Sequence, residues 1–255
     1  MNTLFDLNDK NKLINDVGFA KHFKAGNWAE YNREFFNQLA PKYDALNQVL
    51  TFGLQERYKS KAVKRSGIHD GNLVLDICTG TGDIAFMIAK TFGLCHVIGV
   101  DVAQTMLDLA KQRAAKLENL EFQHADAQSL PFEDHIFDAV FMSYGLRNLT
   151  DPIQGINEMR RVVKPGGVIN IIDLGKPEGC VKKILYQTYF EKVLPFLGKH
   201  IFHRGECNSF KYLPESNKYF PPPAEIKQRL EDCGLYNIRM FTYMGGMVVQ
   251  FIAHA

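Results

Sequence analysis

The sequence has little of several features that mark specialised classes of protein. Its charge is nearly balanced, because 30 Lys and Arg residues against 28 Asp and Glu residues give a net charge of +2. It has no apolar run as long as a membrane span. Its 5 cysteines form neither a CxxC pair nor a zinc-type spacing with histidine. We therefore expect no nucleic-acid partner, no membrane-spanning helix and no metal site.

The N-terminal segment also lacks targeting features. MNTLFDLNDKNKLINDVGF has no basic start followed by an apolar core, and it is not an arginine-rich, acid-poor stretch. We expect a cytoplasmic protein with reduced, mostly buried thiols, which touches a membrane at most from outside.

The residues that are present form an ordinary globular composition, with 46% hydrophobic and 23% charged residues in a chain of 255. This length suits one large α/β domain or two small ones. Residues 1–27 are mixed and polar, which indicates a helix or a loose extension. Residues 28–66 read as helices, which are interrupted at Pro41 and have a candidate joint at Gly53.

From residue 73 onward, short apolar runs alternate with segments of helical spacing. The predicted elements are strands at 73–77, 96–101, 120–126, 137–143 and 168–174, helices at 84–92, 103–117, 152–163 and near 223–233, a turn at Pro165-Gly166-Gly167, and two final strands joined at Gly245-Gly246. This alternation indicates βαβ units whose sheet is covered on both faces. We predict an α/β protein with a doubly wound, seven-stranded, mostly parallel sheet, an N-terminal helical cap and a C-terminal antiparallel hairpin.

A glycine-rich turn, CTGTGD at 78–83, follows the first predicted strand. Gly80 and Gly82 let a ligand approach the backbone closely, and the next helix offers unpaired N–H donors at its start. Asp101 ends the second strand, 19 residues past Gly82, where a carboxylate can accept both ribose hydroxyls of an adenosine. The alternative is a tight turn that binds nothing. The second acidic marker favours a nucleoside-containing ligand.

Three features favour S-adenosylmethionine over a dinucleotide. The turn comes late in the chain, whereas a dinucleotide-binding domain usually opens close to the start of its fold. The third strand ends in Asp126-Ala127, which can bind an adenine edge, and the fourth ends at Ser143, at the sheet edge where ligands bind. Asp83 beside the turn would suit an ammonium group and repel a pyrophosphate.

Motifs in the same order resemble those of class I S-adenosylmethionine-dependent methyltransferases. They are LDICTGTGD, GVDVAQTML, ADAQSLPF, FDAVFMSYGLRNLTD and EMRRVVKPGG. SYGLRNLTD, YFEKVLPFLG, YLPES and the upstream FFNQLAPKYDALNQVLTFGLQERY resemble more narrowly the ubiquinone/menaquinone biosynthesis C-methyltransferase family, over roughly residues 33–252. Thr79 stands where that family more often has glycine. The segments 203–210 and 220–226 also depart from it, which bears on the substrate more than on the cofactor.

The resemblance implies a Rossmann-like methyltransferase fold that binds S-adenosylmethionine and methylates a ring carbon of a prenylated quinol. The implied cofactor-binding residues are Gly80, Thr81, Gly82, Asp101, Val102, Asp126, Ala127 and Ser143. The resemblance is also compatible with a homodimer. It implies an N-terminal cap at 1–66 and a catalytic domain at 67–255, with a lid insertion around 178–222.

Methylation of a ring carbon requires a phenolate, which pushes electron density onto the ortho carbon. Arg147 is the first candidate to stabilise it, because a guanidinium stays protonated and is a poor base. The alternative is that Arg147 pairs with a local carboxylate. We expect Asn148 either to orient the second ring oxygen or to hold the turn. We expect Tyr43 either to close over the cofactor and hydrogen-bond the substrate or to pack between helices. His200 and His203 are alternative bases.

The segment 181–202 mixes aromatic, aliphatic and lysine residues. It is either an amphipathic helix that packs on the domain or a lid over an apolar tunnel, with lysines placed for anionic headgroups. The opposite wall would come from aromatic residues near the N-terminus, namely Phe35, Phe36, Tyr43, Phe52 and Tyr58.

Other functions are compatible with the same sequence. The first is a methyltransferase of this fold that acts on another phenol, a sterol or an amine. The second is a non-catalytic adenosyl-binding subunit of a biosynthetic complex, against which the intact Asp101 and glycine turn argue. A nicotinamide-dependent dehydrogenase is the third. The sequence does not distinguish a benzoquinol from a naphthoquinol acceptor.

Overall fold

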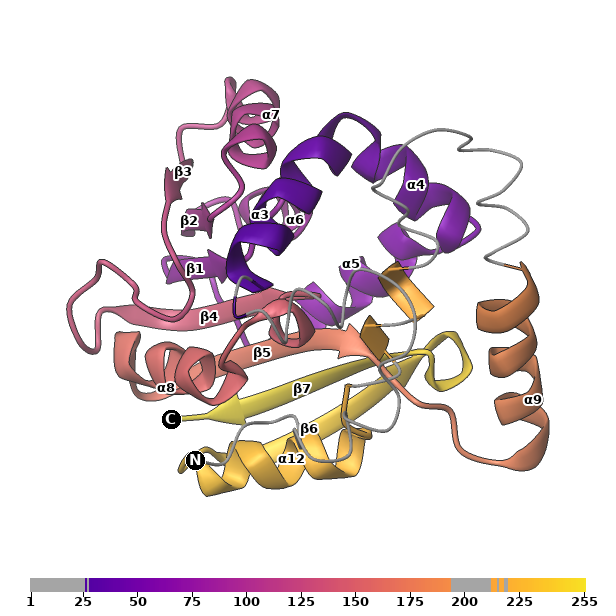
Figure 1. The fold of residues 1–255 in the computed structure, drawn as a ribbon. Helices are drawn as coiled ribbons and strands as arrows, with labels where there is room; N and C mark the ends of the chain where they lie inside the picture. Colours follow the sequence, from indigo (N-terminus) through magenta and orange to yellow (C-terminus); the bar gives the residue numbers. More distant parts are fainter. Residues whose placement is uncertain (1–25, 27, 194–211, 215, 218–219) are drawn as a thin grey trace.

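A computed structural model describes residue 26 and residues 28–193, 212–214, 216–217 and 220–255 of the chain. Its centre is a seven-stranded sheet of order β3-β2-β1-β4-β5-β7-β6, in which β7 alone runs opposite to the other strands (Figure 1). The strands are β1 (Leu73–Ile77), β2 (His96–Asp101), β3 (Leu120–His124), β4 (Phe137–Ser143), β5 (Val163–Leu174), β6 (Tyr236–Tyr243) and β7 (Val248–His254). The predicted seven-stranded sheet with its C-terminal hairpin is confirmed.

Helices cover both faces of this sheet. The main α-helices of the described residues are α3 (Trp28–Leu39), α4 (Tyr43–Leu50), α5 (Gln55–Arg65), α6 (Asp83–Thr91), α7 (Gln104–Ala114), α8 (Pro152–Val162), α9 (Cys180–Thr188) and α12 (Pro223–Asp232). Helices α5, α6 and α7 share one hydrophobic cluster with the sheet, and α8 and α12 share the other. The predicted helices between strands are therefore present, with ends that differ by a few residues.

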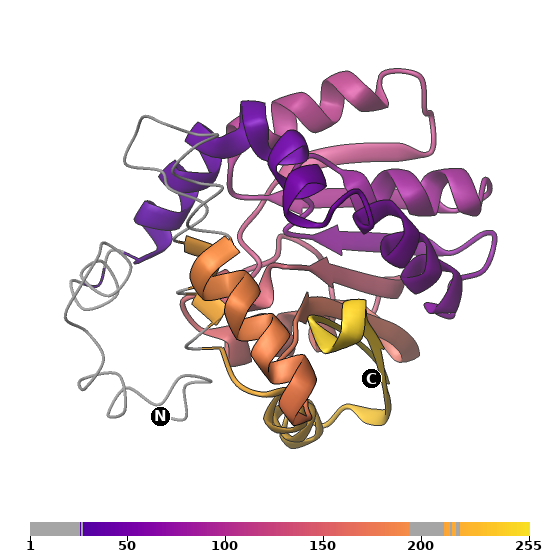
Figure 2. The same ribbon diagram turned by 90° about the vertical axis from the view of Figure 1, so that its right-hand side faces the viewer.

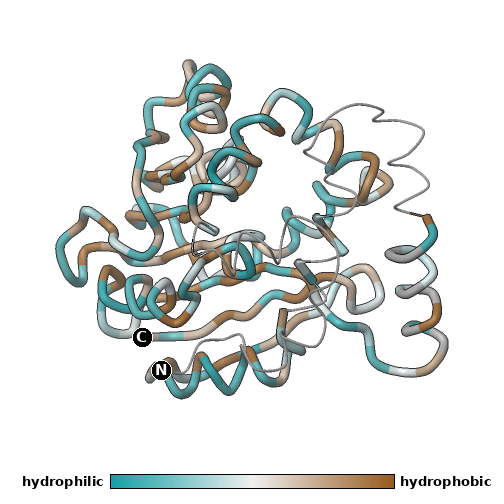
Figure 3. The backbone as a smooth tube through the Cα atoms, viewed as in Figure 1, coloured by the Kyte–Doolittle hydropathy of each residue, from teal (hydrophilic) through white to brown (hydrophobic). Residues whose placement is uncertain are grey.

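The two clusters explain why the strands read as unbroken apolar runs. In β1, Val74 packs into the cluster under α5, α6 and α7, whereas Leu75 and Ile77 pack into the cluster under α8 and α12. Successive side chains of a strand point to opposite faces, so a sheet covered twice needs apolar residues at both phases. In Figure 3, hydrophobic residues accordingly run along the central strands.

The N-terminal helices follow the breaks expected from the sequence. Pro41 lies in a short 3-10 helix, Ala40–Lys42, that separates α3 from α4. Gly53, with φ +71°, lies in the turn between α4 and α5. Positive φ is easy only for glycine, so the predicted joint is confirmed. Most of the segment 1–27 lies outside the described residues.

Strand β5 differs from the prediction. The segment Pro165-Gly166-Gly167 was expected to form a turn before a strand at 168–174, but β5 begins at Val163. Pairing of Phe137 with Val163 and a register shift before Ala139 draw the segment into the sheet. Backbone bonds from Gly166 N to Ala255 O (2.6 Å) and from Ala255 N to Gly167 O (3.2 Å) hold it there. Long-range pairing therefore outweighs the local turn signal.

Helix α9 and a following π-helical turn, Tyr189–Val193, begin the predicted lid segment. They lie outside the two helical layers (Figures 1 and 2), and Tyr186 and Tyr189 pack against Leu46 and Leu50 of α4. The rest of that segment up to 211, including both candidate histidine bases, lies outside the described residues. Within the described part of the chain, no helix is both long and apolar enough to cross a membrane.

Candidate functional site

The glycine turn after β1 has a strained backbone. Cys78, Gly80 and Gly82 have φ of 55°, 57° and 88°. A Cβ on Gly82 would lie 2.8 Å from Cζ of Phe122, whereas a Cβ on Gly80 would lie 3.9 Å from Cε1 of Tyr43. Gly82 is therefore required by both φ and space, and Gly80 by φ alone.

Asp101 holds this turn against the end of β2. Its Oδ2 accepts a hydrogen bond from Gly80 N and its Oδ1 accepts one from Ala103 N, both at 2.9 Å. Burial raises the pKa of Asp101, and the two backbone donors act against that rise. Each carboxylate oxygen can accept a further bond, so the group keeps capacity for the diol expected from the sequence.

Asp76 in the middle of β1 is a site residue that the sequence reading missed. It is buried, and its Oδ2 accepts bonds from Thr79 Oγ1 (2.6 Å) and Ala85 N (3.2 Å). Its Oδ1 has no partner, and burial raises the pKa of this carboxyl to about 7. The available signal was a single acidic residue inside the apolar run LVLDI, because a buried carboxylate needs specific partners.

A polar cleft opens over this turn. Its lining includes Gly80 and Thr81 of the turn, Asp76 and Ser143. The described residues contain four buried side-chain atoms without a hydrogen-bond partner, and two of them, Asp76 Oδ1 and Ser143 Oγ, belong to this lining. Unsatisfied buried polar atoms are costly, so their position here fits a cleft that binds a polar ligand.

The other predicted cofactor residues follow the neighbouring strands along the same edge. Val102 comes directly after β2, and its carbonyl oxygen lies 3.1 Å from Nε2 of His124. Asp126 follows β3 in a short bend, where its Oδ1 accepts a bond from Gln128 N at 2.9 Å, and Ala127 is buried. The carboxyl ends of parallel strands meet at one edge, so these residues extend the row that Gly80 and Asp101 begin.

Asp83 has protein cations as partners. Lys59 Nζ lies 3.1 Å from its Oδ2, and Arg113 Nη2 lies 3.0 Å from its Oδ1. Burial alone would raise the pKa of Asp83, but these two cations outweigh it and the pKa is lowered. The carboxylate expected to face a ligand ammonium group is therefore already neutralised from two sides.

Helix α4 is joined to the glycine turn by a second set of bonds. Thr81 Oγ1 donates to Asp44 Oδ1 (2.7 Å), and Arg113 Nη1 donates to both Asp44 Oδ2 (3.1 Å) and Thr81 O (2.9 Å). Asp44 and Arg113 are each close to half exposed, so these ion pairs are weak individually. Together they hold the N-terminal helices over the cleft.

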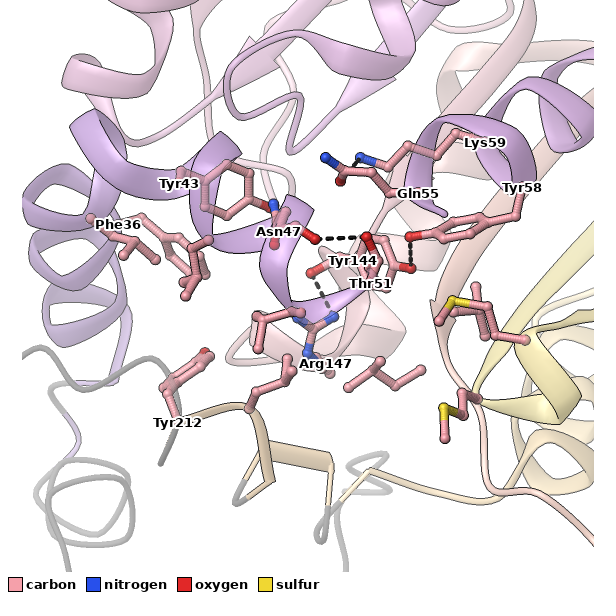
Figure 4. Close-up of a pocket in the computed structure, with 18 of the residues that line it drawn as sticks. Phe36, Tyr43, Asn47, Thr51, Gln55, Tyr58, Lys59, Tyr144, Arg147 and Tyr212 are labelled. Carbon is pink, nitrogen blue, oxygen red and sulfur yellow. Dashed lines mark hydrogen bonds between the residues drawn. The ribbon is translucent and has the colours of Figure 1, made fainter. Parts of the chain in front are cut away.

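A larger, mostly apolar cavity adjoins the cleft (Figure 4). Its empty volume is about 890 Å³, which includes its opening to solvent. Four of the aromatic residues expected in its wall line it, namely Phe35, Phe36, Tyr43 and Tyr58. The fifth, Phe52, is 68% exposed. Tyr43, Lys59 and Tyr144 line both spaces, so the cleft and the cavity meet at these three side chains.

Arg147 brings a fixed positive charge to the cavity wall. It is only 6% exposed, and its Nη1 donates to Asp173 Oδ1 (2.5 Å) and Tyr144 O (3.0 Å). Burial acts to lower the pKa of Arg147, but Asp173 outweighs it and the pKa is raised. Its Nε has no partner. Arg147 therefore pairs with a local carboxylate, as the alternative interpretation expected, and keeps one unpartnered N–H donor.

Asp173 was not singled out from the sequence. It is fully buried near the end of β5 and accepts bonds from Arg147 Nη1, Arg147 N and Leu174 N. Like Asp76, it is a single acidic residue in an apolar strand, IIDL. Its charge holds the guanidinium in place and compensates it.

Asn148 has its side chain committed to the protein. Its Nδ2 donates to Tyr144 O (2.9 Å) and its Oδ1 accepts from the Tyr212 hydroxyl (2.6 Å). Its backbone carbonyl accepts from Trp28 Nε1 and Asn32 Nδ2, both at 2.9 Å. This arrangement favours the expectation that Asn148 holds the turn over the one in which it orients a ring oxygen.

Tyr43, from the start of α4, lines both the cleft and the cavity, and Figure 4 shows it among the residues of the cavity wall. Burial raises the pKa of its hydroxyl, which a bond with the Asn47 side chain partly offsets. A neutral phenol at this position can donate a hydrogen bond to a ligand in either space.

Comparison with known proteins identifies the family to which this chain is similar. The ubiE/COQ5 methyltransferase family model matches residues 25–255. The demethylmenaquinone methyltransferase of Staphylococcus aureus (strain JH9) is 34% identical over 220 residues, which are 86% of this chain and 90% of that protein. The same match is found for the protein of strain Newman.

Solved structures share the fold at lower identity. A SAM-dependent methyltransferase from Aquifex aeolicus has a TM-score of 0.54 and 24% identity, over 76% of this chain and 88% of that one. Phosphoethanolamine N-methyltransferase 2 of Haemonchus contortus, solved with S-adenosyl-L-methionine, has a TM-score of 0.58 and 20% identity, over 78% and 52%. Both structures share the fold that the sequence predicts for this chain. The chain belongs to the ubiE/COQ5 methyltransferase family.

Proposed function

We propose that this protein transfers the methyl group of S-adenosylmethionine to a ring carbon of a prenylated quinol in quinone biosynthesis. One observation carries the proposal: a polar cleft at the strand ends and an apolar cavity with a buried guanidinium meet at Tyr43, Lys59 and Tyr144. A polar, adenosine-bearing donor and an apolar aromatic acceptor need two such spaces side by side.

The cleft fits the donor by its chemistry. Asp101, which accepts a bond from Gly80 N beside the cleft, offers acceptors to a ribose diol, and the unpartnered Asp76 Oδ1 and Ser143 Oγ belong to the cleft lining. Asp126-Ala127 after β3 supplies a carboxylate and a backbone N–H for the adenine edge. When bound, the donor supplies an electrophilic methyl group on its sulfonium.

In the cavity, Arg147 acts on the acceptor. Its unpartnered Nε donates to the ring oxygen on which negative charge develops, and the fixed Asp173 keeps the guanidinium oriented. A positioned cation in a site that excludes water stabilises such a charge far more than a mobile one in water does. The aromatic wall holds the ring in place and excludes water, which aligns its carbon for transfer.

The acceptor we favour is a naphthoquinol. The curated relatives at 34% identity are named demethylmenaquinone methyltransferase, and the match covers 86% of this chain. The apolar lining also suits the prenyl tail, whose burial stabilises binding in proportion to its area.

The decisive experiment uses labelled S-adenosylmethionine with demethylmenaquinol and with a ubiquinol analogue that lacks the ring methyl group, followed by location of the label in the product. We expect label on the ring carbon ortho to a hydroxyl, with faster transfer to the naphthoquinol. Label on an oxygen or nitrogen, or donor binding without transfer to either quinol, contradicts the proposal.

We further propose that the protein acts in the cytoplasm, in peripheral contact with the membrane that holds its substrate, and that it forms a homodimer. Exposed apolar side chains support the contact: Phe52 and Leu54 between α4 and α5, and Ile184 on α9, are 68%, 40% and 57% exposed. In liposome flotation, binding that Phe52→Ser weakens supports the contact, and no bound fraction contradicts it. Light scattering tests the dimer.

A further inference from the structure

Two tyrosine hydroxyls meet at the wall of the apolar cavity. Tyr58, from α5, and Tyr144, directly after β4, lie 86 residues apart in sequence, yet their hydroxyl oxygens are 2.5 Å apart. Both side chains line the cavity, and Tyr144 also lines the polar cleft (Figure 4). The hydroxyl pair therefore stands near the place where donor and acceptor would meet.

The two hydroxyls have one more O–H donor than the hydrogen bond between them uses. Each phenol has one O–H, and the bond between them consumes one, whichever oxygen is the donor. Within the part of the chain that the structure describes, neither hydroxyl has another hydrogen-bond partner. One O–H donor is therefore left at the wall of a cavity whose lining is otherwise mainly apolar.

The surroundings keep this donor in its protonated form. Burial raises the pKa of both Tyr58 and Tyr144 above the ordinary tyrosine value of 10.0. The Arg147 guanidinium lies 5.3 Å from the centre of the Tyr144 ring. The two candidate contacts for a ligand, the Arg147 Nε and the tyrosine pair, thus belong to one wall.

We propose that the Tyr58–Tyr144 hydroxyl pair is a second oxygen subsite of the acceptor cavity, which donates a hydrogen bond to the ring oxygen that Arg147 does not bind. The inference rests on the proposed function and deepens it, because a quinol carries two oxygens on one ring. Two fixed donors orient such a ring, whereas one lets it rotate about the remaining bond. The pair thus acts as a positioning device that selects dihydroxy rings and the carbon presented to the donor.

The test compares two acceptors that differ by one oxygen. One is a demethylmenaquinol analogue with both hydroxyls, and the other is the matching naphthol that keeps only the hydroxyl ortho to the methylated carbon. The main variant is Tyr58→Phe/Tyr144→Phe, which removes both hydroxyls and keeps both rings. Because it removes both partners of a buried bond, it leaves no unpaired hydroxyl behind and is expected to fold.

We expect the double variant to lose about 10-fold in kcat/KM and in affinity for the dihydroxy acceptor, with no matching loss for the naphthol. Affinities are measured by calorimetry with S-adenosylhomocysteine present, so that a slow acceptor is still informative. The single variants identify which hydroxyl faces the ring. Tyr236→Phe, a half-exposed tyrosine that packs on His254 at the C-terminal hairpin, is the matched control.

An equal loss on both acceptors, or no loss on either, overturns the subsite. These outcomes differ from failure of the proposed function, in which the wild-type protein itself binds the cofactor but methylates no quinol ring.

Discussion

The polar cleft and the apolar cavity are built in different ways, although they share three side chains. The cleft comes mainly from the ends of parallel strands and the turns after them, with residues between 76 and 144. The cavity comes from helices α3, α4 and α5 and from segments near the opposite end of the chain, up to Val248. One space is fixed by the sheet, and the other depends on how distant elements pack around it.

This difference separates two tasks of the molecule. Strand ends in a buried sheet hold carboxylates and backbone donors rigidly, which suits a donor molecule that is the same for many acceptors. Helices that pack over the sheet edge form a wall whose side chains can differ from one family to the next. We therefore expect changes in the cleft to affect donor binding, and changes in the cavity wall to affect the acceptor alone.

Arg147→Ala gives the largest expected separation of the two spaces. We expect kcat to fall by about 10²–10³, because the charge that we propose to stabilise the phenolate is lost, while affinity for S-adenosylmethionine stays unchanged. Methyl transfer and donor binding are measured in parallel, with thermal unfolding as a check, since Asp173 is left buried without its cation. Arg147→Lys keeps the positive charge but loses the planar set of N–H donors, so its kcat should lie between those of the wild type and Arg147→Ala. Unchanged turnover would remove Arg147 from the mechanism.

Gly82→Ala tests the rigidity of the cleft, with Gly80→Ala as its matched control. Both residues have positive φ, but only at Gly82 would the new Cβ fall 2.8 Å from Phe122. We expect Gly82→Ala to lower the free energy of unfolding by about 3 kcal/mol, and Gly80→Ala by about 1–2 kcal/mol. Denaturant titration measures both. Equal losses would mean that the turn relaxes and that space at Gly82 is not limiting.

Asp76→Asn tests a buried carboxyl of the cleft through pH. The pKa of Asp76 is raised from an ordinary 3.8 to about 7, so the folded protein holds its proton more tightly than the unfolded chain does. Wild-type stability relative to Asp76→Asn should therefore fall between about pH 4 and pH 7, by up to about 1.4 kcal/mol per pH unit. Unfolding of both proteins is measured across this range without cofactor. If the difference in free energy of unfolding between the two proteins does not change with pH, the pKa of Asp76 is not raised by burial.

Asp44→Asn gives the smallest expected effect and probes the connection between the two spaces. The variant can keep the bond from Thr81 but loses its charge pairing with Arg113, and both partners of that pair are close to half exposed. Such pairs contribute below about 1 kcal/mol, so we expect roughly a two- to threefold weaker donor affinity at low salt. The difference should vanish at high salt. A large loss at every salt concentration would show that α4 is held by more than these contacts.

Much of the cleft follows from sequence because its parts are local. Gly80, Gly82 and Asp101 stand at fixed distances from recognisable strands, and the topology of parallel strands then brings them to one edge. The same logic missed Asp76 and Asp173, which lie inside strands. A carboxylate in an apolar strand is a signal in itself, because it is buried only when specific partners compensate it.

The cavity was predictable in kind but not in detail. The aromatic residues near the N-terminus were expected to form a wall, and four of them do, but Phe52 faces solvent. Helical spacing predicts on which face of a helix a side chain lies. It does not predict which other element packs against that face. The pairing of Tyr58 with Tyr144 across 86 residues has no local signal.

The sequence by itself determined the alternation of strands and helices, the glycine turn and the family, since each rests on short-range spacing and on residue types that few backbones tolerate. Only the tertiary structure decided that β5 runs through Pro165-Gly166-Gly167, that Asn148 is committed to Tyr144 and Tyr212, and that Arg147 is paired with Asp173 while its Nε keeps no partner. These outcomes depend on contacts between segments far apart in the chain. Local patterns carry no information about which distant groups will share a proton or a charge.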